Sequence, residues 1–161
     1  MPIKIMSPAF EQGGTIPQKH TCDASDGRGV SPELLWASVP EDTQSLVLIC
    51  DDPDAVSGTR LHWVIYNLSP KTKRLPEAVK KLPKGARWGK NGDGRAAYIG
   101  PRPPKGTGTH HYFFKLYALD AKIKLRKFTI EALLTEMKGR ILDKGELIGH
   151  YRWINPEERL S

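Results

Sequence analysis

The sequence predicts a mainly β protein, an antiparallel β-sandwich with one peripheral C-terminal helix and long loops. Short apolar segments rich in β-branched and aromatic residues recur along the chain, and turn-forming residues separate them. Only one segment, at 129–138, has the spacing of an amphipathic helix. With 161 residues the chain is expected to form one domain at 1–154, followed by a flexible tail at 155–161.

Three strands are expected within the first 50 residues. Short strands are expected at 4–6 and 34–36, with a polar loop between them at 20–31. The run SLVLIC at 45–50 is apolar throughout and too short for a typical helix, so it predicts a strand buried on both faces. Pro53 has no N–H to donate to a sheet, so this strand must end near it.

The next apolar run, LHWVIYNL at 61–68, has no polar face and predicts a central strand. The connection that follows, 70–98, is long and basic. We expect a helical turn at 75–82, with Pro76 at its first position, and no regular structure at 85–94. Regular alternation along 61–68 places on one face His62, Val64, Tyr66 and Leu68, and on the other face Leu61, Trp63, Ile65 and Asn67.

The segment 100–120, GPRPPKGTGTHHYFFKLYALD, begins as a loop and ends as a strand. Its prolines and glycines leave the loop little freedom, which is how a rigid pocket rim is built. The alternative is a surface loop that leads into a core strand. Alternation places His110, Tyr112, Phe114 and Leu116 on one face, and His111, Phe113, Lys115 and Tyr117 on the other.

The helix at 129–138 is amphipathic, and a last strand is expected at 146–153. Thr129 can cap the start of the helix and Gly139 can end it. Its apolar stripe consists of Ile130, Leu133, Leu134 and Met137.

Asp52, His62 and His110 each lie at an expected strand end. If they converge, the histidines can donate to an anion, Asp52 can orient one imidazole, and Tyr112 can add a hydroxyl and a wall. Alternatives are a metal site of two histidines and a carboxylate, or a hydrolase that uses a serine nucleophile. Taken singly, each residue could instead be structural. The candidate nucleophiles would be Ser31, Ser57 and Ser69.

The formal net charge is +7, and much of the excess lies between Lys71 and Arg95. Such a surface can attract anions or form a solvated loop, and no recognised nucleic-acid motif accompanies it. No apolar run approaches the roughly 20 residues of a membrane span, and the N-terminal residues MPIKIMSPAF lack the apolar region of a secretory signal, so a cytoplasmic location is expected. Cys22 and Cys50 are expected to be reduced thiols, although one bridge between them is left open.

Four segments together resemble the phosphatidylethanolamine-binding protein (PEBP) family, in its bacterial and archaeal Raf-kinase-inhibitor-like branch. They are IPQKHTCDASDGRGVSPELLW at 16–36, DPDA at 52–55, HWVIYNL at 62–68 and the 100–120 segment. The resemblance implies a β-sandwich with a small preformed anion pocket for phosphorylated headgroups, without a metal or cofactor. Carried over position by position, the pocket consists of Asp52, His62, Gly100, Pro101, His110 and Tyr112.

Three positions depart from the family pattern. Val56 stands where proline commonly follows DPDA, Arg102 where many bacterial relatives have cysteine, and His111 where many have arginine. Val56 is expected to loosen the rim, and Arg102 to add positive charge at the mouth. His111 should point away from the pocket because it alternates with His110.

We therefore expect a protein that binds small anions or phospholipid headgroups and does no covalent chemistry, with affinity rising as pH falls through the histidine pKa. One alternative is a loop-mediated interaction module that inhibits a protease or kinase and whose pocket is incidental. Another is a hydrolase. The sequence leaves the oligomeric state open, with a homodimer among the outcomes.

Overall fold

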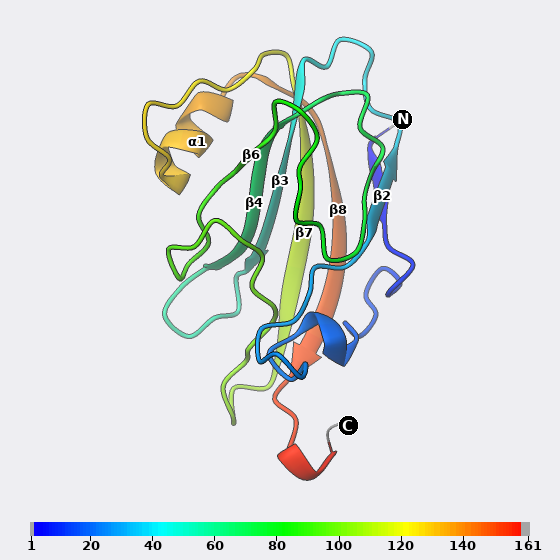
Figure 1. Cartoon of the computed structure of the whole chain (residues 1–161), viewed down its shortest axis with the longest axis vertical. Helices are drawn as coiled ribbons and strands as arrows, with labels where there is room; N and C mark the ends of the chain where they lie inside the picture. Colours follow the sequence, from blue (N-terminus) through cyan, green and yellow to red (C-terminus); the bar gives the residue numbers. More distant parts are fainter. Residues whose placement is uncertain (1, 159–161) are drawn as a thin grey trace.

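The computed structural model describes residues 2–158 and has two antiparallel sheets and one α-helix over that range (Figure 1). The smaller sheet has the strand order β1-β2-β5 and the larger β6-β4-β3-β7-β8. The predicted mainly β fold with one peripheral helix is therefore confirmed. The strands are β1 Lys4–Met6, β2 Leu34–Ala37, β3 Ser45–Asp52, β4 Arg60–Leu68, β5 Arg74–Leu75, β6 Arg87–Trp88, β7 Thr109–Leu119 and β8 Ile141–Arg152.

Both faces of the larger sheet are covered. One face packs against the smaller sheet, and Trp36 of that sheet shares a hydrophobic core with residues such as Leu48 and Phe114. The other face packs against α1 (Ile130–Met137) and the segment before it, where Leu133 meets Val47. Every residue of β3 is buried as a result, which confirms the strand predicted to be buried on both faces.

The helix begins and ends where the sequence indicates. The Thr129 hydroxyl accepts a hydrogen bond from the backbone N–H of Ala132 at 3.0 Å, and Gly139 follows with a φ of +79°. Leu133 and Met137 are buried, whereas Leu134 is 48% exposed. Leu134 therefore lies at the edge of the apolar stripe.

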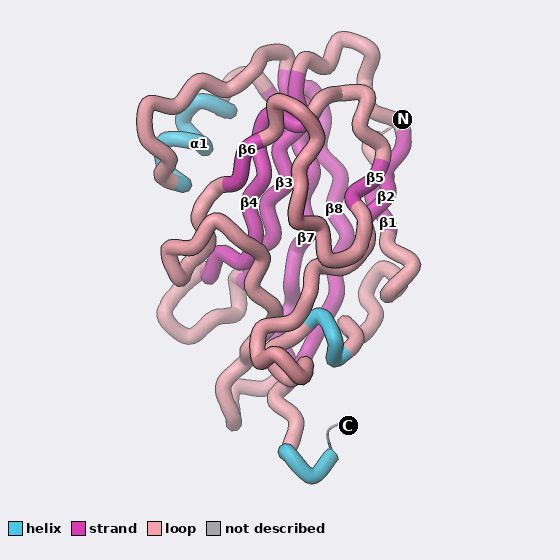
Figure 2. The backbone as a smooth tube through the Cα atoms, in the orientation of Figure 1, coloured by secondary structure: helices cyan, strands magenta, loops and turns pink. Residues whose placement is uncertain are grey.

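The helical turn predicted at 75–82 is wrong. Leu75 pairs with Leu34 of β2, and Ala78 has a φ of +56°, which an α-helix does not contain. Tertiary contacts determine the conformation of this segment. Val79 and Leu82 pack against the core, and the N–H of Ala78 donates to the carbonyl of Ser31. Figure 2 shows the connection as loop apart from the short strands β5 and β6.

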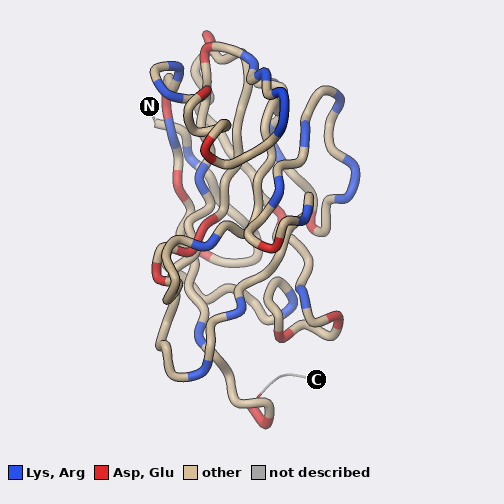
Figure 3. Tube along the Cα trace, turned by 90° about the vertical axis from the view of Figure 1, so that its left-hand side faces the viewer, with Lys and Arg blue, Asp and Glu red and all other residues tan. Residues whose placement is uncertain are grey.

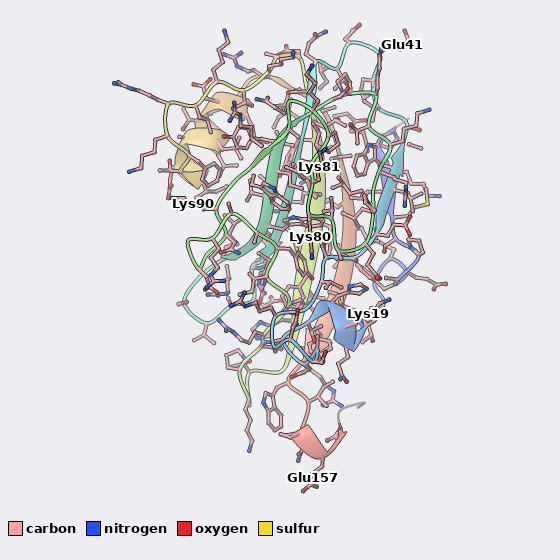
Figure 4. The ribbon with its side chains drawn as sticks, in the orientation of Figure 1. Lys19, Glu41, Lys80, Lys81, Lys90 and Glu157 are labelled. Carbon is pink, nitrogen blue, oxygen red and sulfur yellow. The ribbon has the colours of Figure 1, made fainter. Side chains whose placement is uncertain are left out.

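The basic residues between Lys71 and Arg95 are exposed on this connection. Lys80, Lys81 and Lys90 are among them (Figure 4). Figure 3 shows that Asp and Glu positions are interspersed with Lys and Arg along the chain. The excess charge is thus spread over an exposed loop that covers the larger sheet.

Two short 3₁₀ helices, at Gln18–His20 and Pro156–Glu158, complete the described elements. The second lies in the predicted tail, whose residues 159–161 are outside the described range. Cys22 and Cys50 are not joined by a disulfide. Of the helices in residues 2–158, none has the length and apolar character needed to cross a membrane.

Candidate functional site

Four of the predicted site residues, Asp52, His62, His110 and Tyr112, meet at one end of the central strands of the larger sheet. β4 and β7 both run antiparallel to β3, so the end of β3 lies beside the beginnings of its two neighbours (Figure 1). The side chains there surround a cavity of about 230 Å³. Its lining consists of Asp52, Ala55, Val56, Ser57, Arg60, His62, Arg102, Pro104, His110 and Tyr112.

A β-bulge brings His62 to this cavity. Cys50 pairs with Trp63 but Asp51 pairs with Leu61, so His62 is the extra residue on β4. Trp63 faces the smaller sheet and Leu61 packs toward the helix side. The prediction that His62 shares a face with Val64 and Leu68 was therefore wrong, because the alternation of β4 is interrupted.

A second register shift lies at the other end of β4. Leu46 pairs with Leu68 and Leu48 with Ile65, and Asn67 between them has a φ of +57°. Leu68 consequently joins the core on the smaller-sheet side, whereas Tyr66 joins the helix side. β7 has no such interruption between His110 and Leu116, and Tyr112, Phe114 and Leu116 share one core as predicted.

Hydrogen bonds engage both ring nitrogens of His110. Nδ1 lies 2.6 Å from Oδ2 of Asp52, and both side chains are almost completely buried. Nε2 lies 2.9 Å from the Thr107 hydroxyl, whose oxygen is 2.6 Å from the carbonyl oxygen of Pro104. Two oxygens this close need a hydrogen between them, so Thr107 donates to Pro104 and accepts from His110. Nε2 therefore carries a hydrogen, and a second hydrogen lies between Nδ1 and the Asp52 carboxyl group.

His62 is held differently. Its Nδ1 donates to the carbonyl of Ile99 at 2.7 Å, and burial lowers the pKa of its ring. Its Nε2 is buried and has no hydrogen-bond partner within residues 2–158. The hydroxyl of Tyr112 is likewise buried without a partner in that range, and the two rings meet edge to face with centroids 5.2 Å apart. The cavity thus contains two buried polar atoms that the described chain leaves unsatisfied.

Gly100 and Pro101 lie behind this cavity and are not among its lining residues. The N–H of Gly100 donates to the carbonyl of Arg28, and the carbonyl of Pro101 accepts from the N–H of Cys22. A side chain at position 100 would collide with the backbone, since an added Cβ would lie 2.3 Å from the carbonyl oxygen of His20. These two residues therefore tie the pocket loop to the segment 20–28.

The three departures from the family pattern have separate places. Val56 is on the rim and 78% exposed. Arg102 lines the mouth, with a guanidinium nitrogen 3.8 Å from Asp93. His111 points away from the cavity, as expected, and its ring pairs with Asp54 on the outside of the strand at 2.9 Å.

The structure adds contributors that sequence reasoning missed. Thr107 and Ile99 hold the two histidines, and Arg60 lines the cavity wall while pairing with Asp93. The GTG sequence around Thr107 is typical of a turn, but it does not indicate that the Thr107 hydroxyl contacts a ring nitrogen of His110. Ile99 acts through its carbonyl, which no side-chain pattern can indicate.

The other site chemistries find less support in the geometry. Over residues 2–158, no group of three or more His, Cys, Asp or Glu side chains is arranged to hold a metal ion. Of the three candidate serines, only Ser57 lines the cavity. Both ring nitrogens of His110 are engaged by Thr107 and Asp52, so neither is available to accept a proton from Ser57.

The two buried histidines predict acid sensitivity. Burial lowers the pKa of both His20 and His62 below the usual 6.5, so the unfolded chain binds protons more readily than the native protein in that range. The contribution of these two rings to stability should therefore be complete above pH 6.5 and decline below it, by up to about 1.4 kcal/mol per pH unit for each ring. Urea unfolding from pH 7.5 to 5 would measure this. Each of His20→Gln and His62→Gln should flatten the slope, and a wild-type stability that is constant over this range would contradict the prediction.

Comparison with known proteins places the chain in a family. Residues 6–152 match the family model described as phosphatidylethanolamine-binding protein. A UPF0098 protein of Methanothermobacter thermautotrophicus is 44% identical over 154 residues, which cover 93% of this chain and 99% of the relative.

Two solved structures are similar along almost the whole chain. CT736 from Chlamydia trachomatis has a TM-score of 0.85 and 36% identity, covering 95% of this chain and 99% of that one. YbcL of Escherichia coli, described as a new member of the mammalian PEBP family, has a TM-score of 0.87 and 28% identity, covering 96% and 100%. The chain therefore belongs to the phosphatidylethanolamine-binding protein family.

Proposed function

We propose that the cavity between the end of β3 and the beginnings of β4 and β7 binds a small oxyanion, such as the phosphate of a phosphorylated headgroup. The observation that carries this proposal is the pair of buried atoms, Nε2 of His62 and the Tyr112 hydroxyl, that lack partners within the described chain. A buried polar group without a hydrogen bond costs about 1–3 kcal/mol. A ligand that bonds to both atoms recovers that free energy.

Size and charge favour a small anion. The cavity of about 230 Å³ is smaller than a typical drug-sized pocket and suits a group the size of phosphate. Arg60 and Arg102 line it and supply cationic donors. Asp93 offsets part of this charge through its pair with Arg60. Phosphate bonds well to cationic donors of this kind.

In this proposal the protein binds its ligand without covalent chemistry. His110 is fully engaged by Asp52 and Thr107, and is therefore not available as a proton acceptor. A kinase or protease partner, a homodimer and a cytoplasmic location stay predictions from the sequence.

NMR titration of the folded protein with phosphate and with phosphoethanolamine tests the proposal. Saturable shifts are expected at the imidazole signals of His62 and His110. In His110→Gln the affinity should fall at least tenfold, because the buried Asp52 carboxylate loses its ring partner and repels the anion. The matched control is His111→Gln, which changes the neighbouring histidine on the outer face and should bind as the wild type does.

Other results would count against it. The absence of shifts at both rings, or equal binding by the two variants, would mean that the cavity is not the anion site. A protein partner captured equally by both variants would instead favour the loop-mediated interaction. Amide spectra of each variant would establish that it is folded.

A further inference from the structure

We propose that this pocket selects phosphate monoesters in their singly protonated form, and discriminates against anions of the same shape and charge that carry no hydrogen on oxygen. This inference rests on the proposed function and narrows its ligand class. It follows from the hydrogen-bonding direction of His62, which the backbone fixes.

The tautomer of His62 is determined by Ile99. A carbonyl oxygen only accepts hydrogen bonds, so the contact of 2.7 Å requires the hydrogen to be on Nδ1. In a neutral ring Nε2 then carries a lone pair and can only accept. The sequence predicted that both histidines donate to an anion, whereas the geometry gives His62 the opposite direction.

The surroundings of His62 favour the neutral ring. Burial is the main cause that lowers its pKa, and the Arg60 cation on the same strand lowers it further. The hydrogen bond to Ile99, Asp52 at the end of β3 and Asp93 in the loop after β6 act the other way, but burial outweighs them. Arg102, Tyr112 and His110 line the same cavity, and the Arg102 cation also disfavours a further positive charge.

The ligand must therefore complement two kinds of group. Its anionic oxygens meet the cationic side, formed by Arg60 and Arg102, and the Tyr112 hydroxyl can donate to it. One of its oxygens must carry a hydrogen to donate to Nε2 of His62. A phosphate monoester meets this requirement as its monoanion, since its second pKa is about 6. Sulfate esters, carboxylates and phosphate diesters at neutral pH have no such hydrogen.

Methyl phosphate and methyl sulfate form a suitable probe pair, because they have the same shape and differ by one O–H when both are monoanions. At pH 6, after correction for the monoanion fraction, methyl phosphate should bind at least about tenfold more tightly, as expected when a buried acceptor is left unpaired. Between pH 6 and 8 the apparent affinity for methyl phosphate should fall roughly 50-fold with the monoanion fraction. The affinity for methyl sulfate should stay weak throughout.

Two variants locate the discrimination. His62→Asn retains an amide that can donate to Ile99 but removes Nε2, so the ratio of the two affinities should fall to near one. Tyr112→Phe removes the other unpartnered group and should weaken both ligands while preserving the ratio. The ¹⁵N signals of His62 should show one hydrogen, on Nδ1, in the free protein and in the methyl phosphate complex.

The outcomes separate this inference from the proposed function. If neither ligand binds, both fail. If both ligands bind with similar affinity, or if His62 becomes an imidazolium in the complex, the anion site stands and the selection of a protonated ligand is overturned.

Discussion

Asp52→Asn is expected to lower the free energy of unfolding by about 3 kcal/mol or more, the range seen when one partner of a buried ion pair is removed. The Asp52 carboxylate accepts from His110 through one oxygen and from the N–H of Asp54 at 2.8 Å through the other. Asparagine offers one acceptor oxygen and presents an N–H₂ to the remaining donor. It also leaves the buried His110 ring without its counter-charge.

The chain provides a matched control two residues further on. Asp54 pairs with His111 at 2.9 Å, but those side chains are 43% and 51% exposed, compared with 4% and 2% for Asp52 and His110. Exposed ion pairs contribute about 0–1 kcal/mol, so Asp54→Asn should have a small effect. Urea unfolding of both variants at pH 7 makes the comparison. Similar losses in the two would show that burial does not govern the energetics of the Asp52–His110 pair.

The sequence predicted the position of one site histidine, His110, better than that of the other, His62. His110 and Tyr112 lie on a regularly alternating strand, so period two was sufficient to put them on one face. His62 lies at a bulge, and the residue pattern of 61–68 is equally apolar on both faces and gives no sign of the extra residue. The sequence analysis included His62 in the site because the residue lies at a strand end and because the family resemblance places a pocket histidine there.

The connection 70–98 shows a second limit. Pro76 and the apolar residues after it fit a helical start, but Val79 and Leu82 pack against the core without forming a helix, and Ala78 adopts a left-handed conformation. The conformation of this segment depends on its contacts with the core, which the local sequence does not reveal. The role of Gly100 was also hidden, because its close approach to His20 and Arg28 depends on a segment some eighty residues earlier in the chain.

That earlier segment gives the second large expected effect. Gly27 and Gly29 both have a φ in the left-handed region, +75° and +78°, where any side chain adds about 1–2 kcal/mol of strain. An added Cβ at Gly27 meets nothing within 4 Å, whereas at Gly29 it would lie 2.5 Å from the carbonyl carbon of His20. Gly27→Ala should therefore cost about 1 kcal/mol, and Gly29→Ala about 3 kcal/mol, since overpacking adds a further 1–3 kcal/mol.

The consequence for the site distinguishes this prediction from a general loss of stability. The segment around Gly29 supports the pocket loop, because Arg28 accepts from Gly100 and the carbonyl of His20 accepts from the Tyr98 hydroxyl at 2.7 Å. Ile99, between those two positions, fixes the His62 ring. Gly29→Ala should therefore weaken phosphate binding as well as lower the urea midpoint, and Gly27→Ala should leave binding unchanged. Equal effects of the two substitutions on both measurements would mean that the backbone contact behind Gly29 does not support the site.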